Sequence, residues 1–472
     1  MISTRATDPT TKAAGPVTES SARAVIDAPS ERFGIWDWAL CGLLILASLA
    51  VGLVHVPQHD SISPIDEFVY IDYLAKVPTE GVVQRGEETG DYAREYFACN
   101  GVRTYIARQP DLCNASDFDA DASFPFNGKT SADLYAPLYF GTTWVVAQPL
   151  QWAGISDLTE AGRYTGWMWL AAALVLLYAT LRRLNVARFP GFGMGLVVAG
   201  SLPAYWSHTY ISTDATALPA GALMLFLAVY FLQTRRHGWL LPRAAVLVTL
   251  SKLQNLMAVG AVGLLLVLCA AVEAFAHVDL NLPDKIRIWS RSALARVGFL
   301  AVFAALLAQV GWTVIRSVIA VGPAPDQLVA TPIGWTAMLS EVFKFFPGAI
   351  QGAVAPDGLG VYAIVIASLG SSLIAAGVLG LIAVGRPRSF GVLLAISALT
   401  VALVAGPALA IANLATSGFY FPLPARYGLA LVPIFVCCAA LLFSNKRWTG
   451  YAVGSAGAVA FLLSLAVTEI PM

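Results

Sequence analysis

Acidic side chains that could activate a nucleophile stand together early in the chain. Asp66 and Glu67 are adjacent, in the segment 63–73 that follows the first hydrophobic run. On a helix they would point about 100° apart, so they cannot both face one partner. A carboxylate held at the membrane–water boundary can remove a proton from a hydroxyl group. The alternative is an ordinary solvated helix start, where Pro64 and acids are both favoured.

Further charged and polar side chains interrupt or border the later apolar segments: His208, Asp214, Lys252, Arg316, Glu341, Lys344 and Arg426. A charge at membrane depth costs about 3 kcal/mol, so each is a functional candidate unless it merely snorkels to the interface. Arg and Lys are suited to binding phosphate. A carboxylate base with a basic clamp predicts transfer of a group from a lipid phosphate to an alcohol, because the phosphate leaves as an anion needing electrostatic support.

The composition determines the class of protein in which these residues stand. The chain has 472 residues, of which 57% are hydrophobic and 12% are charged, against roughly 25% charged in soluble domains. This composition predicts an all-α polytopic membrane protein. The zero net charge and the lack of a basic tail argue against a nucleic-acid partner. There is no Cys-x-x-Cys or His-rich pattern, so no metal site is expected.

The hydropathy pattern predicts eleven membrane-spanning helices, at 34–56, 163–181, 190–207, 214–232, 239–250, 254–275, 297–319, 360–384, 390–412, 427–443 and 449–467. Clusters of Arg and Lys follow alternate spans, which places the N-terminus in the cytoplasm. Residues 1–32 are rich in Ser, Thr, Ala and Pro and are predicted to be a disordered cytoplasmic tail. The apolar run 138–152 is short and contains Pro149, so we expect it to lie along the outer face.

The large first loop, 57–162 with its juxtamembrane helices, is predicted to be extracytoplasmic. Residues 57–135 of this loop include 14 Asp and Glu residues and only six Lys and Arg residues. Such a length indicates a functional segment, not a connector. Cys99 and Cys113 are the two cysteines of this loop, and an oxidising compartment would favour a disulfide between them. The segment 321–358 is aromatic-rich, and its sequence fits either a lid or a lipid-facing surface helix.

Several short motifs resemble the GT-C superfamily, the polytopic glycosyltransferases that use polyprenyl-phosphate-linked sugars. The matching motifs are Asp66-Glu67, Ala136-Pro137-Leu138-Tyr139-Phe140, Arg163 at the start of a span, Ser212-Thr213-Asp214-Ala215 and Leu250-Ser251-Lys252. Arg426-Tyr427 is similar to a group of bacterial GT-C-like membrane proteins of unassigned function. The likeness covers about 34–445, and residues 33–472 are expected to form one GT-C-like transmembrane domain. Ala136 departs from the family's usual proline.

The resemblance implies a role for each matching residue. Asp66 would be the catalytic base, assisted or oriented by Glu67, and Lys252 and Arg426 would contact the donor phosphate. Arg316 is a third expected phosphate ligand. The expected substrate contacts are Asp214, His208, Asp133 and Tyr139.

The resemblance also implies an inverting, metal-independent transfer without a cofactor. The donor would be a polyprenyl-phosphate sugar, and the acceptor a glycan or lipid of the cell envelope. The membrane lipids are the other expected partners. The protein would lie in the plasma membrane, with its active site outside the cell.

Three other classes of protein stay open at this stage. A lipid or polysaccharide transporter or flippase would explain Lys252 between two short apolar segments, although such proteins often show internal repeats and we find none. A ligase or polymerase that joins whole oligosaccharides usually has its large outer loop late in the chain. A structural or assembly subunit is compatible with the same composition.

Overall fold

The computed structural model describes residues 33–113, 121–277, 279–325, 331–332, 334–354, 360–417, 420–444 and 446–468. The predicted disordered tail, 1–32, lies outside this part of the chain. Over the described residues the protein is all-helical, and it contains isolated β-bridges but no strand. The predicted fold class is therefore confirmed as a helical, multi-pass membrane type.

Nine helical segments in the described residues are long and apolar enough to cross a membrane. They are built around α1 (Ile35–His55), α7 (Gly166–Arg183), α10 (Ala217–Thr234), α12 (Leu256–Phe275), α14 (Ala293–Val318), α16 (Gly360–Val384), α17 (Phe390–Ser417), α18 (Val432–Phe443) and α19 (Arg447–Ala466). Each coincides with one of the eleven predicted spans. Long hydrophobic runs with few charges therefore predicted most of the bundle.

The other two predicted spans are shorter than expected. The prediction of one helix over 190–207 is wrong, because α8 (Arg188–Ala199) ends before Gly200 and α9 (Leu202–Thr209) begins after Ser201. The Ser201 side chain caps α9 by accepting a hydrogen bond from the Ala204 N–H, at 3.4 Å. Residues 239–250 correspond to α11 (Leu240–Ser251), which has 12 residues. A helix of that length rises about 18 Å, less than a hydrocarbon core of about 30 Å.

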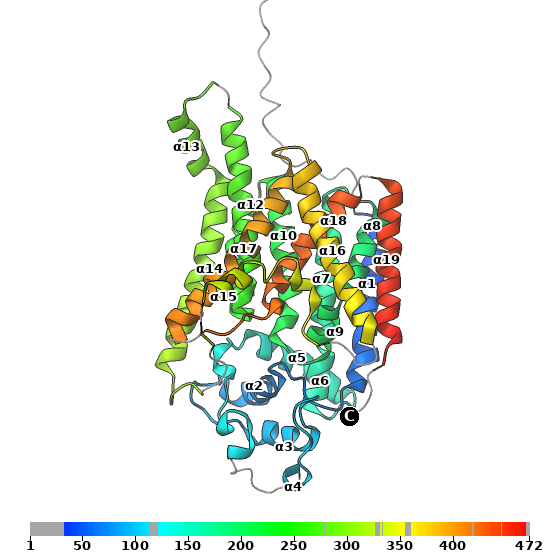
Figure 1. Cartoon of the computed structure of the whole chain (residues 1–472), viewed down its shortest axis with the longest axis vertical. Helices are drawn as coiled ribbons and strands as arrows, with labels where there is room; N and C mark the ends of the chain where they lie inside the picture. Colours follow the sequence, from blue (N-terminus) through cyan, green and yellow to red (C-terminus); the bar gives the residue numbers. More distant parts are fainter. Residues whose placement is uncertain are drawn as a thin grey trace, which may run out of the picture.

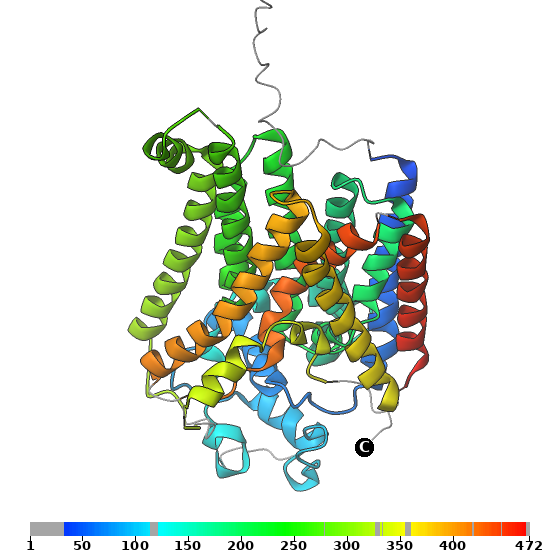
Figure 2. The same cartoon turned by 45° about the horizontal axis from the view of Figure 1, so that its top comes forward.

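The two ends of the bundle differ in what they carry (Figure 1). One end, here the basic end, bears α13 (Leu282–Arg291). The opposite end, the loop end, bears α2 (Glu67–Glu80), α3 (Asp91–Asn100), α4 (Pro110–Cys113), α5 (Leu138–Trp152) and α6 (Leu158–Tyr164). The tilted view shows the long helices running between these ends, with α15 (Trp335–Val342) beside α17 (Figure 2). The first polar loop therefore folds into a helical cap over one end of the bundle.

A disulfide between Cys99 and Cys113 closes part of this cap. It joins the C-terminal turn of α3 to α4. The other four cysteines, Cys41, Cys269, Cys437 and Cys438, are free and buried. The Cys99–Cys113 disulfide is thus the feature of the cap that needs an oxidising compartment to form.

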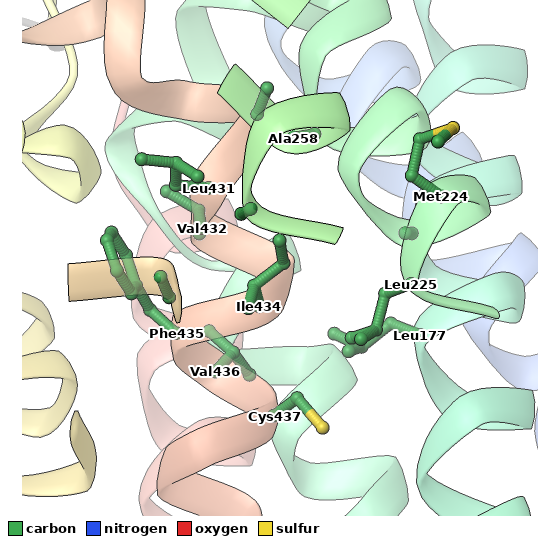
Figure 3. Close-up of a cluster of buried hydrophobic side chains, with 14 of the residues drawn as sticks. Leu177, Met224, Leu225, Ala258, Leu431, Val432, Ile434, Phe435, Val436 and Cys437 are labelled. Atoms are coloured by element: carbon green, nitrogen blue, oxygen red, sulfur yellow. The ribbon is translucent and has the colours of Figure 1, made fainter. Parts of the chain in front are cut away.

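The centre of the bundle is packed with aliphatic side chains from α7, α10, α12 and α18 (Figure 3). Leu177, Met224, Leu225, Ile434 and Phe435 are at most 2% exposed. The described centre of the bundle is therefore apolar, and the buried charges discussed below lie where the bundle meets the cap.

Within the segment 321–358, the structure describes all of α15 and part of the chain on either side of it. Phe345 and Phe346 are buried, whereas Trp335 and Phe343 are exposed. Because some of these aromatic side chains are buried and others exposed, a lid and a lipid-facing surface helix both stay open as interpretations of this segment.

Candidate active site

A cluster of two acids and two bases forms where the cap meets the bundle. It consists of Asp66, Asp214, Lys252 and Arg426, called the four-residue cluster below. Arg426 Nη2 lies 3.0 Å from Asp66 Oδ2, and its Nε lies 3.3 Å from Asp214 Oδ2. Lys252 Nζ pairs with Asp214 Oδ1. Two positive and two negative charges thus balance one another in a single array.

Each member of the cluster stands at a break in the helices. Asp66 immediately precedes α2, and Asp214 lies in η6 (Thr213–Thr216), a 3₁₀ turn that opens α10. Lys252 has an extended backbone between α11 and η7 (Leu253–Asn255). Arg426 belongs to η10 (Ala425–Leu431), which leads into α18. Helix ends thus bring these four charges together where the cap meets the bundle.

The backbone of Asp66 adopts a left-handed conformation, with φ 56°. This region is sparsely populated by residues other than glycine, although Asp tolerates it better than most. Such strain persists where surrounding contacts enforce it, and it concentrates at functional sites. The conformation turns Asp66 toward Arg426 while the next residue enters α2.

Glu67 points to a different partner, as the helical geometry predicted. Its carboxylate is fully buried and forms a bidentate ion pair with Arg163, with both N–O distances 2.9 Å. It also accepts hydrogen bonds from the backbone N–H groups of Ser63, at 2.7 Å, and Ile211, at 2.9 Å. Arg163 donates further to the carbonyls of His59 and Ser61. Glu67 therefore ties the start of α2 to three other segments.

Solvent exposure separates the two adjacent acids. The side chain of Asp66 is 46% exposed, whereas that of Glu67 is 0% exposed. Lys252 and Asp214 are each 2% exposed at the side chain, and Arg426 is 12% exposed. Asp66 is thus the accessible carboxylate of the cluster, and Lys252 and Arg426 are less exposed than it is.

Tyrosine side chains surround the cluster. The Tyr70 hydroxyl donates to the Tyr135 hydroxyl at 2.9 Å, and Thr213 donates to Tyr70 at 3.3 Å. The ring of Tyr427 lies 5.6 Å from Lys252 Nζ and 5.4 Å from Arg426 Cζ, which are cation–π distances. These rings restrict water around the charges.

Burial shifts the ionisation of the groups beside Asp66. It lowers the pKa of Lys252, and the neighbouring Asp214 carboxylate opposes that shift. It raises the pKa of Tyr70 and of Tyr135 well above the ordinary value, and nearby acids add to the effect. Both phenols therefore stay neutral and act as hydrogen-bond donors or acceptors.

Several predicted site residues lie outside the cluster. Arg316 pairs with Asp133, and burial raises the pKa of Asp133. Among the described residues, no hydrogen bond or ion pair joins that pair to Asp66 or Lys252. The structure thus does not bring Arg316 into the expected clamp.

Two other expected substrate contacts are also buried in the protein. The Tyr139 hydroxyl accepts a hydrogen bond from the Ser212 N–H at 3.0 Å, so it supports the turn that carries Asp214. His208 is 1% exposed, and its Nδ1 lies 2.8 Å from the Ser207 hydroxyl. Both side chains thus support the site from the protein interior.

Sequence reasoning gave no role to Tyr70, Tyr135 and Tyr427 and only noted Arg163 as the start of a span. The sequence did contain a signal for Tyr70 and for Arg163. Tyr70 is four residues after Asp66, which puts it on the same face of a helix. Arg163 is a charge at the head of an apolar stretch, which is costly unless it is paired.

A search of protein-family models finds no match to this chain. A search of the curated proteins finds none either. The functional conclusion therefore depends on the residues of the site.

An apolar groove of about 840 Å³ runs beside the cluster, between α5, α11 and α14. It is lined by side chains such as Val145, Leu247, Leu250 and Ile315. Leu250 and Lys252 are two residues apart, so their Cα atoms are separated by at most about 7.6 Å. Ala136, another lining residue, directly follows Tyr135. A lining residue of the apolar groove thus lies two positions before the buried Lys252.

The ion pair inside the cap yields a first prediction. Glu67→Gln or Arg163→Met leaves one buried charge without a partner, which we expect to lower the free energy of unfolding by about 3–5 kcal/mol. Asp66→Asn removes a partly exposed pair and should cost about 1 kcal/mol or less. Thermal unfolding of the purified variants measures the difference. Equal stability of Glu67→Gln and the wild type would contradict the organising role of this pair.

Proposed function

We propose that the protein is a membrane glycosyltransferase that moves a sugar from a polyprenyl-phosphate donor to a hydroxyl of a cell-envelope glycan or lipid. The observation that carries the proposal is the four-residue cluster, whose Lys252 lies two positions after Leu250 in the wall of the apolar groove. The groove offers a place for an isoprenoid chain, and the two cations of the cluster offer a place for the phosphate. Asp66 is the exposed carboxylate next to them.

The proposed chemistry assigns one task to each side of the cluster. Asp66 accepts the proton of the acceptor hydroxyl as that oxygen bonds to the anomeric carbon of the donor sugar. The bond between this carbon and the phosphate oxygen breaks, and its electron pair leaves with the polyprenyl phosphate. Arg426 and Lys252 stabilise the negative charge on the leaving phosphate. Attack opposite to the leaving group inverts the anomeric configuration.

The formal charges of the four-residue cluster sum to zero, and this fits the proposed use. Asp214 pairs with Lys252 and with one nitrogen of Arg426. A phosphate that entered would compete with Asp214 for these two cations. The buried acid therefore keeps the cations in position without a ligand, at a lower cost than leaving them unpaired.

The charge distribution supports an extracytoplasmic site. Arg183, Arg235, Lys285 and Arg287 belong to or border the helix ends at the basic end, which the positive-inside rule assigns to the cytoplasm. The loop end then faces outward, where the Cys99–Cys113 disulfide is compatible with the redox conditions. We propose the plasma membrane as the location.

A transporter or flippase is the second candidate. Lys252 stands between two helices, α11 and α12, and transporters often bind substrates at such breaks. Movement of a labelled polyprenyl phosphate across vesicles without sugar transfer would favour it. The exposed position of Asp66 beside two cations supports the transferase, which needs a proton acceptor next to a phosphate site.

Asp66 provides the direct test of the catalytic proposal. We expect purified Asp66→Asn to fold normally and to lose sugar transfer by about 10²–10⁴-fold, because the amide cannot act as a base. Transfer is measured with radiolabelled polyprenyl-phosphate sugars extracted from the producing cell. Glu88→Gln, at an acid of the same cap that is 64% exposed, is the matched control and should retain activity. Wild-type turnover in Asp66→Asn would reject the base assignment.

The groove provides a separate test of donor binding. A Cβ added at Gly141 or Gly311 meets no atom within 4 Å, and both glycines line the groove. Leu at either position would displace about two methylenes of a lipid chain, worth about 0.8 kcal/mol each. We expect the KM for a long-chain donor to rise about tenfold. Gly42→Leu on α1, where a Cβ is equally unobstructed, is the control; an unchanged KM in the groove variants would remove the groove from the donor site.

A further inference from the structure

A second pocket lies in the cap, on the Glu67 side of α2. It has a volume of about 560 Å³ and is lined by α3, α6 and the segment 56–59. This size falls within the range of about 300–1,000 Å³ that is typical of small-molecule sites. Helices α3 and α6 lie at the loop end (Figure 1), so the pocket belongs to the same side of the protein as Asp66. Asp66 belongs to the four-residue cluster, whereas Glu67 is connected to this pocket through its partner Arg163, which lines it.

The wall of this pocket combines aromatic rings with hydrogen-bond acceptors. Tyr92 and Tyr96 lie side by side on α3, with ring centroids 6.4 Å apart and planes 28° apart. The carboxylates of Glu95 and Glu160 line the same pocket and are exposed. Among the described residues, neither has a hydrogen bond or an ion pair. Asn100 adds an amide whose nitrogen donates to the Tyr96 carbonyl at 2.9 Å.

The buried floor supplies a donor as well. Arg163 lines the pocket and is 2% exposed. A guanidinium has five N–H groups, and four hydrogen bonds account for four of them: two to Glu67, one to His59 and one to Ser61. The fifth, on Nη1, has no acceptor among the described residues. A ligand in the pocket could accept from it.

The mixture of groups determines the chemical class of the ligand. Free carboxylates repel a phosphate or another anion. A simple cation would use the carboxylates but gain nothing from the arginine N–H. A sugar hydroxyl both donates and accepts, and the apolar face of a sugar ring packs against aromatic side chains. The wall and the floor together therefore match a neutral saccharide.

We propose that this pocket is a saccharide-binding site, separate from the four-residue cluster. Glu95, Glu160 and Asn100 accept hydrogen bonds from the sugar hydroxyls, Arg163 donates one, and the tyrosine rings contact a sugar face. That the bound saccharide belongs to the acceptor glycan depends on the proposed function; the binding itself does not. The buried ion pair with Glu67 holds Arg163 in the wall of this pocket.

Binding to the full-length protein in lipid nanodiscs tests the proposal. The probe is the neutral oligosaccharide fraction released from the producing cell's envelope by mild acid, labelled with a fluorophore at the reducing end. We expect saturable binding by fluorescence anisotropy. Glu95→Ala/Glu160→Ala should weaken the Kd at least tenfold, whereas Glu95→Gln/Glu160→Gln should retain most of the affinity because the amide oxygen still accepts hydrogen bonds.

Two further variants separate ring contacts from hydrogen bonds. Tyr96→Leu should weaken binding at least fivefold, and Tyr96→Phe should preserve it. Asp91→Asn changes an exposed acid of α3 outside the pocket and should leave the Kd unchanged. Absence of saturable binding by the wild type, or equal affinity in the double alanine variant, would overturn the proposal. Competition by spermidine, abolished by the double glutamine variant, would show a cation site instead.

The same set of proteins distinguishes this inference from the proposed function. Asp66→Asn should bind the oligosaccharides with the wild-type Kd. Saccharide binding without any sugar transfer by the wild type would preserve the pocket and reject the transferase. Sugar transfer without saccharide binding would reject the pocket alone.

Discussion

The buried ion pair between Glu67 and Arg163 is the interaction on which the geometry of the cap depends. Neither side chain is more than 2% exposed, and together they bind the backbone of two segments, at His59, Ser61 and Ser63 before α2 and at Ile211 after α9. Removing two charges from water is costly, and only a bidentate pair with its remaining donors and acceptors satisfied offsets that cost. Because Glu67 is fixed, the preceding residue is fixed as well, and Asp66 is held in a left-handed conformation beside Arg426.

The charges at the cluster and the apolar surface beside it act as parts of one site. Asp214 keeps Lys252 and Arg426 in place, and aromatic rings limit the access of water. In such surroundings the attraction between a cation and an incoming phosphate is stronger than in bulk water. The groove next to Leu250 offers apolar surface for a chain attached to that phosphate. A lipid-linked anion is the ligand class that uses both features.

Hydrophobic runs of about 20 residues predicted the nine long helices, since in lipid every backbone group must be paired within a helix. The break between α8 and α9 was missed, although Gly200, Ser201 and Pro203 carried a signal for it. At the site, the cost of a charge at membrane depth marked Asp214, Lys252 and Arg426, but it marked Arg316, Glu341 and Lys344 equally. The contact between Asp66 and Arg426, 360 positions apart, depends on how the helices pack, so the pattern of the sequence did not contain it. The pairing of Arg316 with Asp133, 183 positions apart, depends on the packing in the same way.

The most direct measurement is an experimental structure of the full-length protein in a lipid nanodisc with a bound polyprenyl phosphate. The account predicts that the phosphate lies within hydrogen-bonding distance of Arg426 and Lys252, with its chain in the groove between α5, α11 and α14. Asp66 should remain open to an acceptor on the side away from the chain. A phosphate bound elsewhere, with the pairs of Asp214 unchanged and the groove empty, would contradict the account.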